Sequence, residues 1–129
     1  MNRDRVAHWV AAYEDAWRTP GTAALDRIFT PDAVYSQGPY AEPRRGRAAI
    51  GRMWEAERKG PDEVFDITSE IVAVDGDTAV VRVRVRYGDP VVHEFLDLWV
   101  TRFAADGRCV AFEEWPFWPG QPLSPAQSG

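Results

Sequence analysis

The sequence contains few of the residues that bind metal ions or form disulfides. A single cysteine, Cys109, in 129 residues excludes an internal disulfide and a thiolate metal cluster. The two histidines, His8 and His93, lie in unrelated segments and lack the spacing of metal ligands. The residue types therefore give little support for a metal site, and we expect no cofactor.

Basic charge and long apolar runs are also scarce. The chain has 15 Lys and Arg against 20 Asp and Glu, which gives a net charge of −5 and argues against nucleic acid as a partner. No apolar run approaches the roughly 20 residues that a membrane span needs. The first ten residues, MNRDRVAHWV, lack the apolar core of a secretory signal. We therefore expect a cytoplasmic protein that contacts neither nucleic acid nor membrane.

Aromatic residues, by contrast, are abundant: they make up 12% of the chain, and six of them are tryptophans. Tryptophan is large and is rarely buried completely, so this number fits a lined cavity or an interface as well as a core. A tryptophan-rich core is an equally good interpretation. The length predicts one domain, which can bury a sizeable core without disulfides.

The first half of the chain has the periodicity of helices. The apolar residues of 3–18 fall on one helical stripe, which predicts a first helix. A second, short helix follows Thr22, a residue that can cap it, and a short strand is expected at 33–36. Residues 47–59 predict a third helix.

The second half has a period of two, which is typical of strands. Four strands are expected, at 64–74, 78–87, 91–103 and 108–118. The loops between them are too short for parallel crossovers, so the strands form an antiparallel meander. The remaining residues, 119–129, are rich in Pro, Ser and Gly, and we expect a mobile tail.

The first hairpin can be aligned from its charges. Placing Glu70 opposite Arg82 also places Ile71 opposite Val81, so one face carries ion pairs and the other carries apolar groups. A slip of one residue would mix the two faces. The apolar face is expected to contact the helices, and the arginine-rich face is expected to point outward.

The third strand of the meander allows two alignments. Placing Tyr87 opposite Val91 puts Asp97 on the helix side and pairs Glu94 with Arg84. A slip of one residue instead places Asp97 opposite Arg82 on the outer side. The first alignment leaves apolar residues on the outer face, which suggests that a second copy of the chain covers them. These outer residues are Leu96, Leu98 and Val100.

Three segments resemble one known family: LDRIFTPDAVYS at 25–36, RRGRAAIGRMW at 44–54, and DLWVTRFAADGRCVAFEEW at 97–115. The chain resembles the SnoaL-like branch of the nuclear-transport-factor-two-like superfamily over most of residues 1–118. The resemblance implies an α+β fold in which a cone-shaped, strongly curved mixed or antiparallel sheet wraps round three N-terminal helices. It also implies an internal cavity and a homodimer through the outer sheet face.

Members of this superfamily include polyketide cyclases, ketosteroid isomerases, dehydratases and epoxide hydrolases, and others only bind ligands. Fold alone does not decide among these activities. We therefore keep two hypotheses. The first is a cofactor-independent acid–base enzyme of isomerase, cyclase, hydratase or hydrolase type that acts on a small ketone, polyketide or epoxide. The second is a ligand-binding or dimerisation module without turnover.

Four residues are candidates for catalysis. Asp97 is flanked by apolar residues, and burial there would raise its pKa and suit it to accept a proton; an ion pair with Arg82 is the alternative. His93, on the same face, could share a proton or lie at the rim. Glu114 is similar in position to an acid that some family members use, although a β-bulge could exchange it with Glu113. Tyr35 could donate a hydrogen bond to an oxyanion.

Aromatic residues are the candidate walls of the cavity, and each could equally be part of a plain core. For Trp9 and Tyr13 the core is the better interpretation. The candidate substrate-binding residues are Trp17, Phe29, Trp54, Phe65, Tyr87, Trp99 and Phe112. Together with the acids they predict a mostly apolar pocket for a small apolar or mixed-polarity ligand.

Overall fold

The computed structural model describes residues 1–60 and 62–124. This part of the chain forms helices α1 (Arg3–Arg18), α2 (Leu25–Ile28) and α3 (Arg47–Glu57). Its strands are β1 (Phe29–Gln37), β2 (Arg44–Arg45), β3 (Phe65–Asp75), β4 (Thr78–Tyr87), β5 (His93–Phe103) and β6 (Cys109–Phe117). A mobile tail over 119–129 stays a prediction, and residues 125–129 lie outside the described part.

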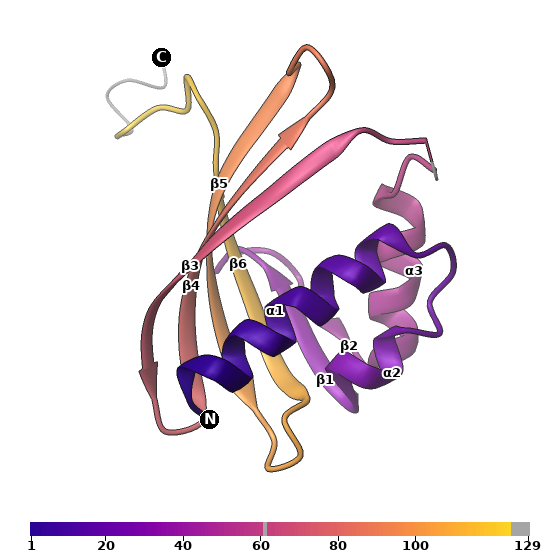
Figure 1. Cartoon of the computed structure of the whole chain (residues 1–129), viewed down its shortest axis with the longest axis vertical. Coiled ribbons are helices and arrows are strands. Elements are labelled where there is room, and N and C mark those ends of the chain that lie inside the picture. The colour runs from indigo at the N-terminus through magenta and orange to yellow at the C-terminus, as the bar shows by residue number, and fades with distance from the viewer. Residues whose placement is uncertain (61, 125–129) are drawn as a thin grey trace.

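The six strands form one twisted sheet in the order β2-β1-β6-β5-β4-β3. β1 runs parallel to β6, and the other neighbours are antiparallel. The sheet is not closed, and the helices lie on one side of its curved surface (Figure 1). The predicted α+β fold, with a strongly curved mixed sheet around the N-terminal helices, is confirmed.

Helix α1 has the bounds that its apolar stripe predicts. The side chain of Asn2 caps it by accepting a hydrogen bond from the Arg5 backbone N–H at 2.9 Å. Val6, Trp9 and Tyr13 are buried against the sheet. Among the described residues, no helix has the length and apolar character needed to cross a bilayer. The cytoplasmic location stays a prediction.

The β3–β4 hairpin has the predicted register along most of its length. Glu70 lies opposite Arg82 and Ile71 opposite Val81. Towards the turn, an irregularity between Ile71 and Ala73 shifts the register by one residue, and Asp75 pairs with Thr78. An unbroken register from Glu70 and Arg82 predicts a three-residue loop, Asp75 to Asp77, and this prediction is wrong. The bulge takes up one residue and leaves a two-residue turn, in which Gly76 has φ of 59°.

Strand β5 keeps its predicted faces but not its predicted partners. Tyr87 lies opposite His93 rather than Val91, and Glu94 lies opposite Arg86. A shift of two residues leaves every side chain on the same face, because the side-chain period is two. Asp97 therefore lies on the helix side, opposite Val83. The alternative ion pair of Asp97 with Arg82 is wrong.

Strand β6 contains a bulge that simple alternation does not predict. Phe103 pairs with Cys109, whereas Arg102 pairs with Ala111, so Val110 is the extra residue. Cys109 consequently lies on the helix side and is fully buried, whereas strict alternation along the strand, with Glu114 facing inward, predicts that Cys109 faces outward. The bulge precedes Phe112, so Glu114 and Glu113 are not exchanged.

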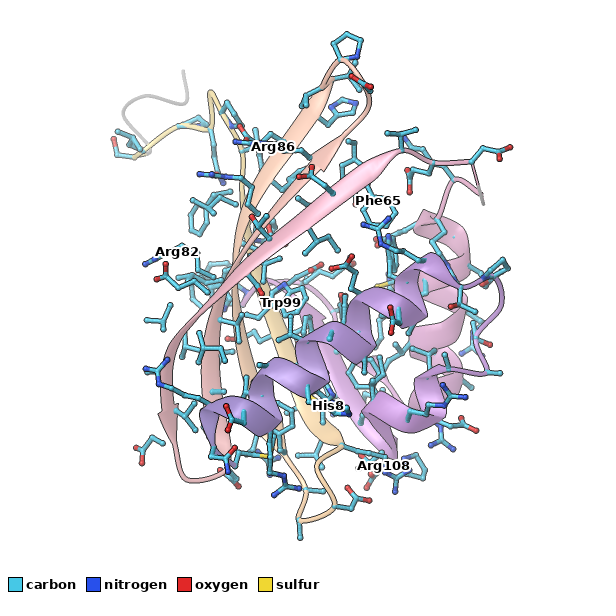
Figure 2. The ribbon with its side chains drawn as sticks, viewed as in Figure 1. His8, Phe65, Arg82, Arg86, Trp99 and Arg108 are labelled. Atoms are coloured by element: carbon cyan, nitrogen blue, oxygen red, sulfur yellow. The ribbon has the colours of Figure 1, made fainter. Side chains whose placement is uncertain are left out.

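The outer face of the sheet carries the arginine row. Arg82 and Arg86 point away from the helices, whereas Trp99 lies on the helix side (Figure 2). Arg82 forms an ion pair with Glu70 at 2.8 Å, and Arg86 forms one with Glu94 at 2.8 Å. This face is therefore lined with paired charges, and the core lies between the helices and the inner face.

Candidate active site

A partly enclosed cavity of about 340 Å³ lies between α1 and the inner face of the sheet. Its volume is at the lower end of the range for small-molecule sites. Nearly every element of the fold contributes to its wall. The lining residues are Tyr13, Trp17, Tyr35, Gln37, Glu57, Ile67, Val85, Tyr87, Phe95, Asp97, Trp99, Glu114 and Pro116.

Three of the four candidate catalytic residues meet in this cavity: Asp97, Glu114 and Tyr35. Glu114 lies opposite Trp99 on the neighbouring strand, so Asp97 is its diagonal neighbour on the same face. Diagonal neighbours of this kind are about 7–8 Å apart. His93 is exposed outside the cavity, so the structure does not bring it together with Asp97, and of the two interpretations given above it agrees with the rim position. The early position of His93 on β5 places it at the rim.

The aromatic candidates divide between the cavity and the core below it. Trp17, Tyr87 and Trp99 line the cavity. The others do not: Phe29, Trp54 and Phe112 are at most 1% exposed and pack in the core, and Phe65 lies beside the Tyr87 ring, with 5.7 Å between ring centroids. The wall assignment is wrong for Phe29, Trp54 and Phe112 because they fill the core, and for Phe65 because its partly buried ring packs against Tyr87 and Arg18 outside the cavity.

Asp97 is held in an apolar setting. It is 8% exposed, and its Oδ1 atom is buried without a hydrogen-bond partner among the described residues. Burial raises the pKa of Asp97 to about 6, because the charged form loses its hydration. The nearby Trp99 indole opposes part of that pKa rise, although its N–H makes no hydrogen bond in the structure.

Glu114 is surrounded by neutral donors. The Tyr35 hydroxyl donates to its Oε2 at 3.4 Å, and the Gln37 amide donates to its Oε1 at 3.4 Å. Burial raises the pKa of Glu114 to about 7, and the negative charges of Asp97 and Glu57 add to the rise. The two hydrogen bonds oppose it. The site therefore contains two carboxyl groups that titrate near neutral pH.

Three polar lining residues were missed by sequence reasoning, Tyr13, Gln37 and Glu57, as were the apolar lining residues Ile67, Val85, Phe95 and Pro116. Tyr13 is on the apolar stripe of α1, and its hydroxyl lies 3.0 Å from the Tyr35 hydroxyl. The Gln37 amide also donates to Glu57 Oε1 at 2.8 Å. The strand period places Gln37 on the same face as Tyr35, so that signal was present in the sequence. Nothing in the sequence indicated that the end of α3 reaches this place.

The tyrosines of the cavity remain proton donors. Burial raises the pKa of Tyr13 and Tyr35 well above the ordinary value, and the charge of Glu114 adds to both rises. Burial likewise raises the pKa of Tyr87 to about 12. A chain of hydrogen bonds therefore links the Tyr13 hydroxyl, the Tyr35 hydroxyl and the Glu114 carboxyl group. The two tyrosine hydroxyls keep their protons at neutral pH. Such groups can hydrogen-bond a ligand oxygen.

Metal chemistry has no evident ligand set at this site. Within residues 1–60 and 62–124, no group of three or more His, Cys, Asp or Glu is arranged to hold a metal ion. The cavity acids are instead coupled to a tyrosine and an amide. The chemistry that this arrangement can perform is proton transfer.

Replacing Asp97 by asparagine is expected to stabilise the protein above pH 7. The folded-state pKa of about 6 lies above the ordinary 3.8, so the unfolded chain releases this proton first and stability falls as pH rises between these values. Such a difference corresponds to about 3 kcal/mol, and we expect a gain of about 1–3 kcal/mol at pH 8. Urea unfolding at pH 8 and pH 3.5 measures it.

The gain should be small at pH 3.5, where Asp97 is protonated in the folded state and mostly protonated in the unfolded state. Asp75→Asn, at an exposed position on β3, is the matched control and should change stability by at most about 0.5 kcal/mol. An Asp97→Asn protein that is no more stable than the wild type at pH 8 would show that Asp97 is not destabilised by burial.

Comparison with known proteins identifies first the fold class and then the family. A solved structure from Methylobium petroleophilum, described as a protein of unknown function with a cystatin-like fold, has a TM-score of 0.72 at 16% identity. It covers 100% of this chain and 84% of that one. A ketosteroid isomerase candidate from Kribbella flavida has a TM-score of 0.67 at 21% identity, with coverage of 95% and 83%. These likenesses show the fold.

The family follows from the sequence model of the SnoaL-like domain, which matches residues 10–113. The chain belongs to the SnoaL-like family. A polyketide cyclase candidate from Sinorhizobium meliloti is 30% identical, with a TM-score of 0.63 and coverage of 84% of this chain and 94% of that one. A search of curated proteins finds no match.

Proposed function

We propose that the protein is a cofactor-independent acid–base enzyme that moves a proton within a small, largely apolar carbonyl compound. The observation that carries this proposal is the pair of carboxyl groups, Asp97 and Glu114, at one aromatic cavity. Their pKa values of about 6 and 7 lie close to neutral pH, where general acids and bases are most effective. Perturbed pKa values of this kind are typical of functional sites.

The two carboxyl groups have different parts in this scheme. Asp97, with the lower pKa, is the base that takes a proton from the carbon next to the carbonyl group. The electrons of that C–H bond form a C=C bond, and the carbonyl electrons move to oxygen. Protonated Glu114 and the Tyr35 hydroxyl hydrogen-bond that oxygen. The step requires a substrate with a C=C bond β,γ to the carbonyl group, so that a dienolate forms. The electrons of that original C=C bond then take the proton back from Asp97 at the γ-carbon. The carbonyl bond re-forms, the new C=C bond lies between the α- and β-carbons, and the product is the conjugated isomer.

The surroundings of the acids also favour such a substrate. Tyr87, Trp99 and Phe95 offer apolar surface next to Asp97, and Tyr35 offers a donor next to Glu114. The names of the similar proteins, a polyketide cyclase candidate and a ketosteroid isomerase candidate, point to carbonyl substrates as well. These names support the reaction type and leave the substrate open.

Isomerisation of cyclohex-3-en-1-one to cyclohex-2-en-1-one tests the proposal, because the conjugated product absorbs in the ultraviolet. The value of kcat/KM is expected to rise as Asp97 loses its proton near pH 6 and to fall as Glu114 loses its proton near pH 7. Because Asp97 and Glu114 interact, the two apparent pKa values of this pH–rate profile describe the pair and not either residue alone. Ketone binding without any rate above the buffer reaction, from pH 5 to 8, would instead indicate a binding module.

We also propose a homodimer through the outer face of the sheet. Leu96, Trp115 and Phe117 are 38%, 37% and 46% exposed and lie on neighbouring strands of that face. Covering them removes apolar surface from water. Light scattering during gel filtration should give twice the mass of one chain for the wild type. The Trp115→Glu variant should give the mass of a single chain. A wild-type protein of single-chain mass would contradict the dimer.

A further inference from the structure

All charged residues that line the cavity are acidic. Glu57, Asp97 and Glu114 contribute carboxyl groups, and no Lys, Arg or His is present among the described lining residues. A cleft lined by charge of one sign attracts ligands of the opposite sign and repels those of the same sign. A ligand that carries a carboxylate or a phosphate would therefore be disfavoured in this cavity.

The arginines near the aromatic wall are already occupied. Arg18 lies over the Phe65 ring at 4.0 Å and forms an ion pair with Glu14 at 2.9 Å. Arg58 forms an ion pair with Glu55 and donates hydrogen bonds to backbone carbonyls after the end of α1. Neither arginine lines the cavity. The negative charge of the cavity is thus not balanced by these side chains.

Asp97 differs from the other two acids in its lack of a donor. Glu57 accepts a hydrogen bond from Gln37, and Glu114 accepts hydrogen bonds from Gln37 and Tyr35. Asp97 has a buried oxygen with no partner among the described residues. A buried acceptor without a donor is costly, and a ligand with an N–H group can remove that cost. A charged N–H donor gives the stronger hydrogen bond.

The walls suit a cation for a separate reason. Aromatic faces attract ammonium groups through the electrostatic field of the ring, most strongly where water is excluded. Six aromatic residues line this small cavity: Tyr13, Trp17, Tyr35, Tyr87, Phe95 and Trp99. Three of them come from β4 and β5, the strands that also position Asp97.

We propose that the substrate is an amino ketone, bound as its ammonium ion with an N–H donated to Asp97 and its hydrocarbon part against the aromatic wall. This inference rests on the proposed function, because it assigns the substrate class of the same cavity. One Asp97 oxygen accepts the ammonium hydrogen bond, and the other is left to take the C–H proton. The positive charge also acidifies the neighbouring C–H group.

Three probes of similar shape test this charge preference: benzylamine, benzyl alcohol and benzoate, at pH 7.5. Binding is measured by titration calorimetry and by the fluorescence of Trp17 and Trp99, which line the cavity. Benzylamine should bind at least about ten-fold more tightly than benzyl alcohol, because a hydrogen bond to a charged group contributes about 1.5–3 kcal/mol. Benzoate should not bind.

Two variants test whether the preference for benzylamine depends on Asp97. Asp97→Asn, checked for folding by circular dichroism, should reduce benzylamine affinity to that of benzyl alcohol. Glu113→Gln is the matched control, because Glu113 lies on the other face of β6 and accepts a hydrogen bond from the Trp115 indole at 2.6 Å. It should keep the preference.

The inference is overturned if benzyl alcohol or benzoate binds as tightly as benzylamine, if none of the three binds, or if Asp97→Asn keeps the preference. These outcomes are distinct from failure of the proposed function. Turnover of cyclohexenone without amine preference would keep the enzyme and remove the amine. Amine preference without turnover of any carbonyl compound would keep the ligand class and remove the enzyme.

Discussion

Replacing Asp97 by asparagine is expected to lower kcat/KM for ketone isomerisation by about 10²–10⁴-fold. The asparagine side chain has nearly the same shape as that of aspartate and would lie in the same apolar surroundings, but its amide cannot act as a base. No other carboxylate faces the apolar wall of the cavity in the same way: Glu114 is tied to Tyr35 and Gln37, and Glu57 is exposed near the end of α3. Initial rates at pH 6.5 measure the loss.

Two further variants show whether the loss belongs to the site. Glu114→Gln should also lower kcat/KM, because it removes the acid that faces the developing oxyanion. Glu113→Gln, one residue away on the outer face, should leave it within about two-fold. An Asp97→Asn enzyme that keeps more than a tenth of the wild-type rate would mean that another group is the base.

Replacing Phe112 by alanine is expected to destabilise the fold by about 3–5 kcal/mol. Phe112 is 1% exposed and packs in the centre of an aromatic cluster. Its ring lies 4.5 Å from the Tyr35 ring and 5.1 Å from the Trp99 ring, measured between centroids. The loss combines buried apolar surface with a cavity that the rigid neighbouring rings cannot fill. Urea unfolding followed by tryptophan fluorescence measures it.

Tyr40 is the control for this experiment. Its side chain is fully exposed, so Tyr40→Ala should change the free energy of unfolding by at most about 0.5 kcal/mol. A Phe112→Ala protein that loses less than about 1 kcal/mol would mean that Phe112 does not pack in the core. In that case Phe112 would be assigned to the cavity wall, as the sequence predicts.

The helices and most strand bounds could be predicted because each depends on a local period. Helix α1 ends where its apolar stripe ends, and β4 has the predicted residues, Thr78–Tyr87. The inner face of β5 was also correct although its partners were not, since a shift of two residues preserves the faces. The length of the β4–β5 loop, which sets the partners, has no such periodic signal.

Bulges and long-range pairing account for the remaining differences. The extra residue at Val110 reverses the side of Cys109, and the irregularity in β3 shortens the first turn. The parallel pairing of β1 with β6 brings Tyr35 and Gln37 next to Glu114. These residues are 79 and 77 positions away from Glu114 in the sequence. Composition and period carry no information on that pairing.

Among the acids of the candidate site, Asp97 could be predicted from its neighbours in the sequence alone. Asp97 stood out because Leu96 and Leu98 flank it in the chain. Glu113 and Glu114 are adjacent and chemically identical, yet only Glu114 faces the cavity and has its pKa raised by burial. Environment, and not residue type, makes the difference. The donors Tyr13 and Gln37 became visible only in three dimensions.

The central claim is that Asp97 and Glu114 are buried carboxyl groups that titrate near neutral pH in a shared cavity. Carbon-13 NMR titration of their carboxyl carbons, assigned with Asp97→Asn and Glu114→Gln, measures this directly. The predicted midpoints are near pH 6 and pH 7, and Asp97→Asn should lower the Glu114 midpoint, because the Asp97 charge raises it. Midpoints below about 5 for both groups, in the range of ordinary exposed carboxylates, would contradict the claim.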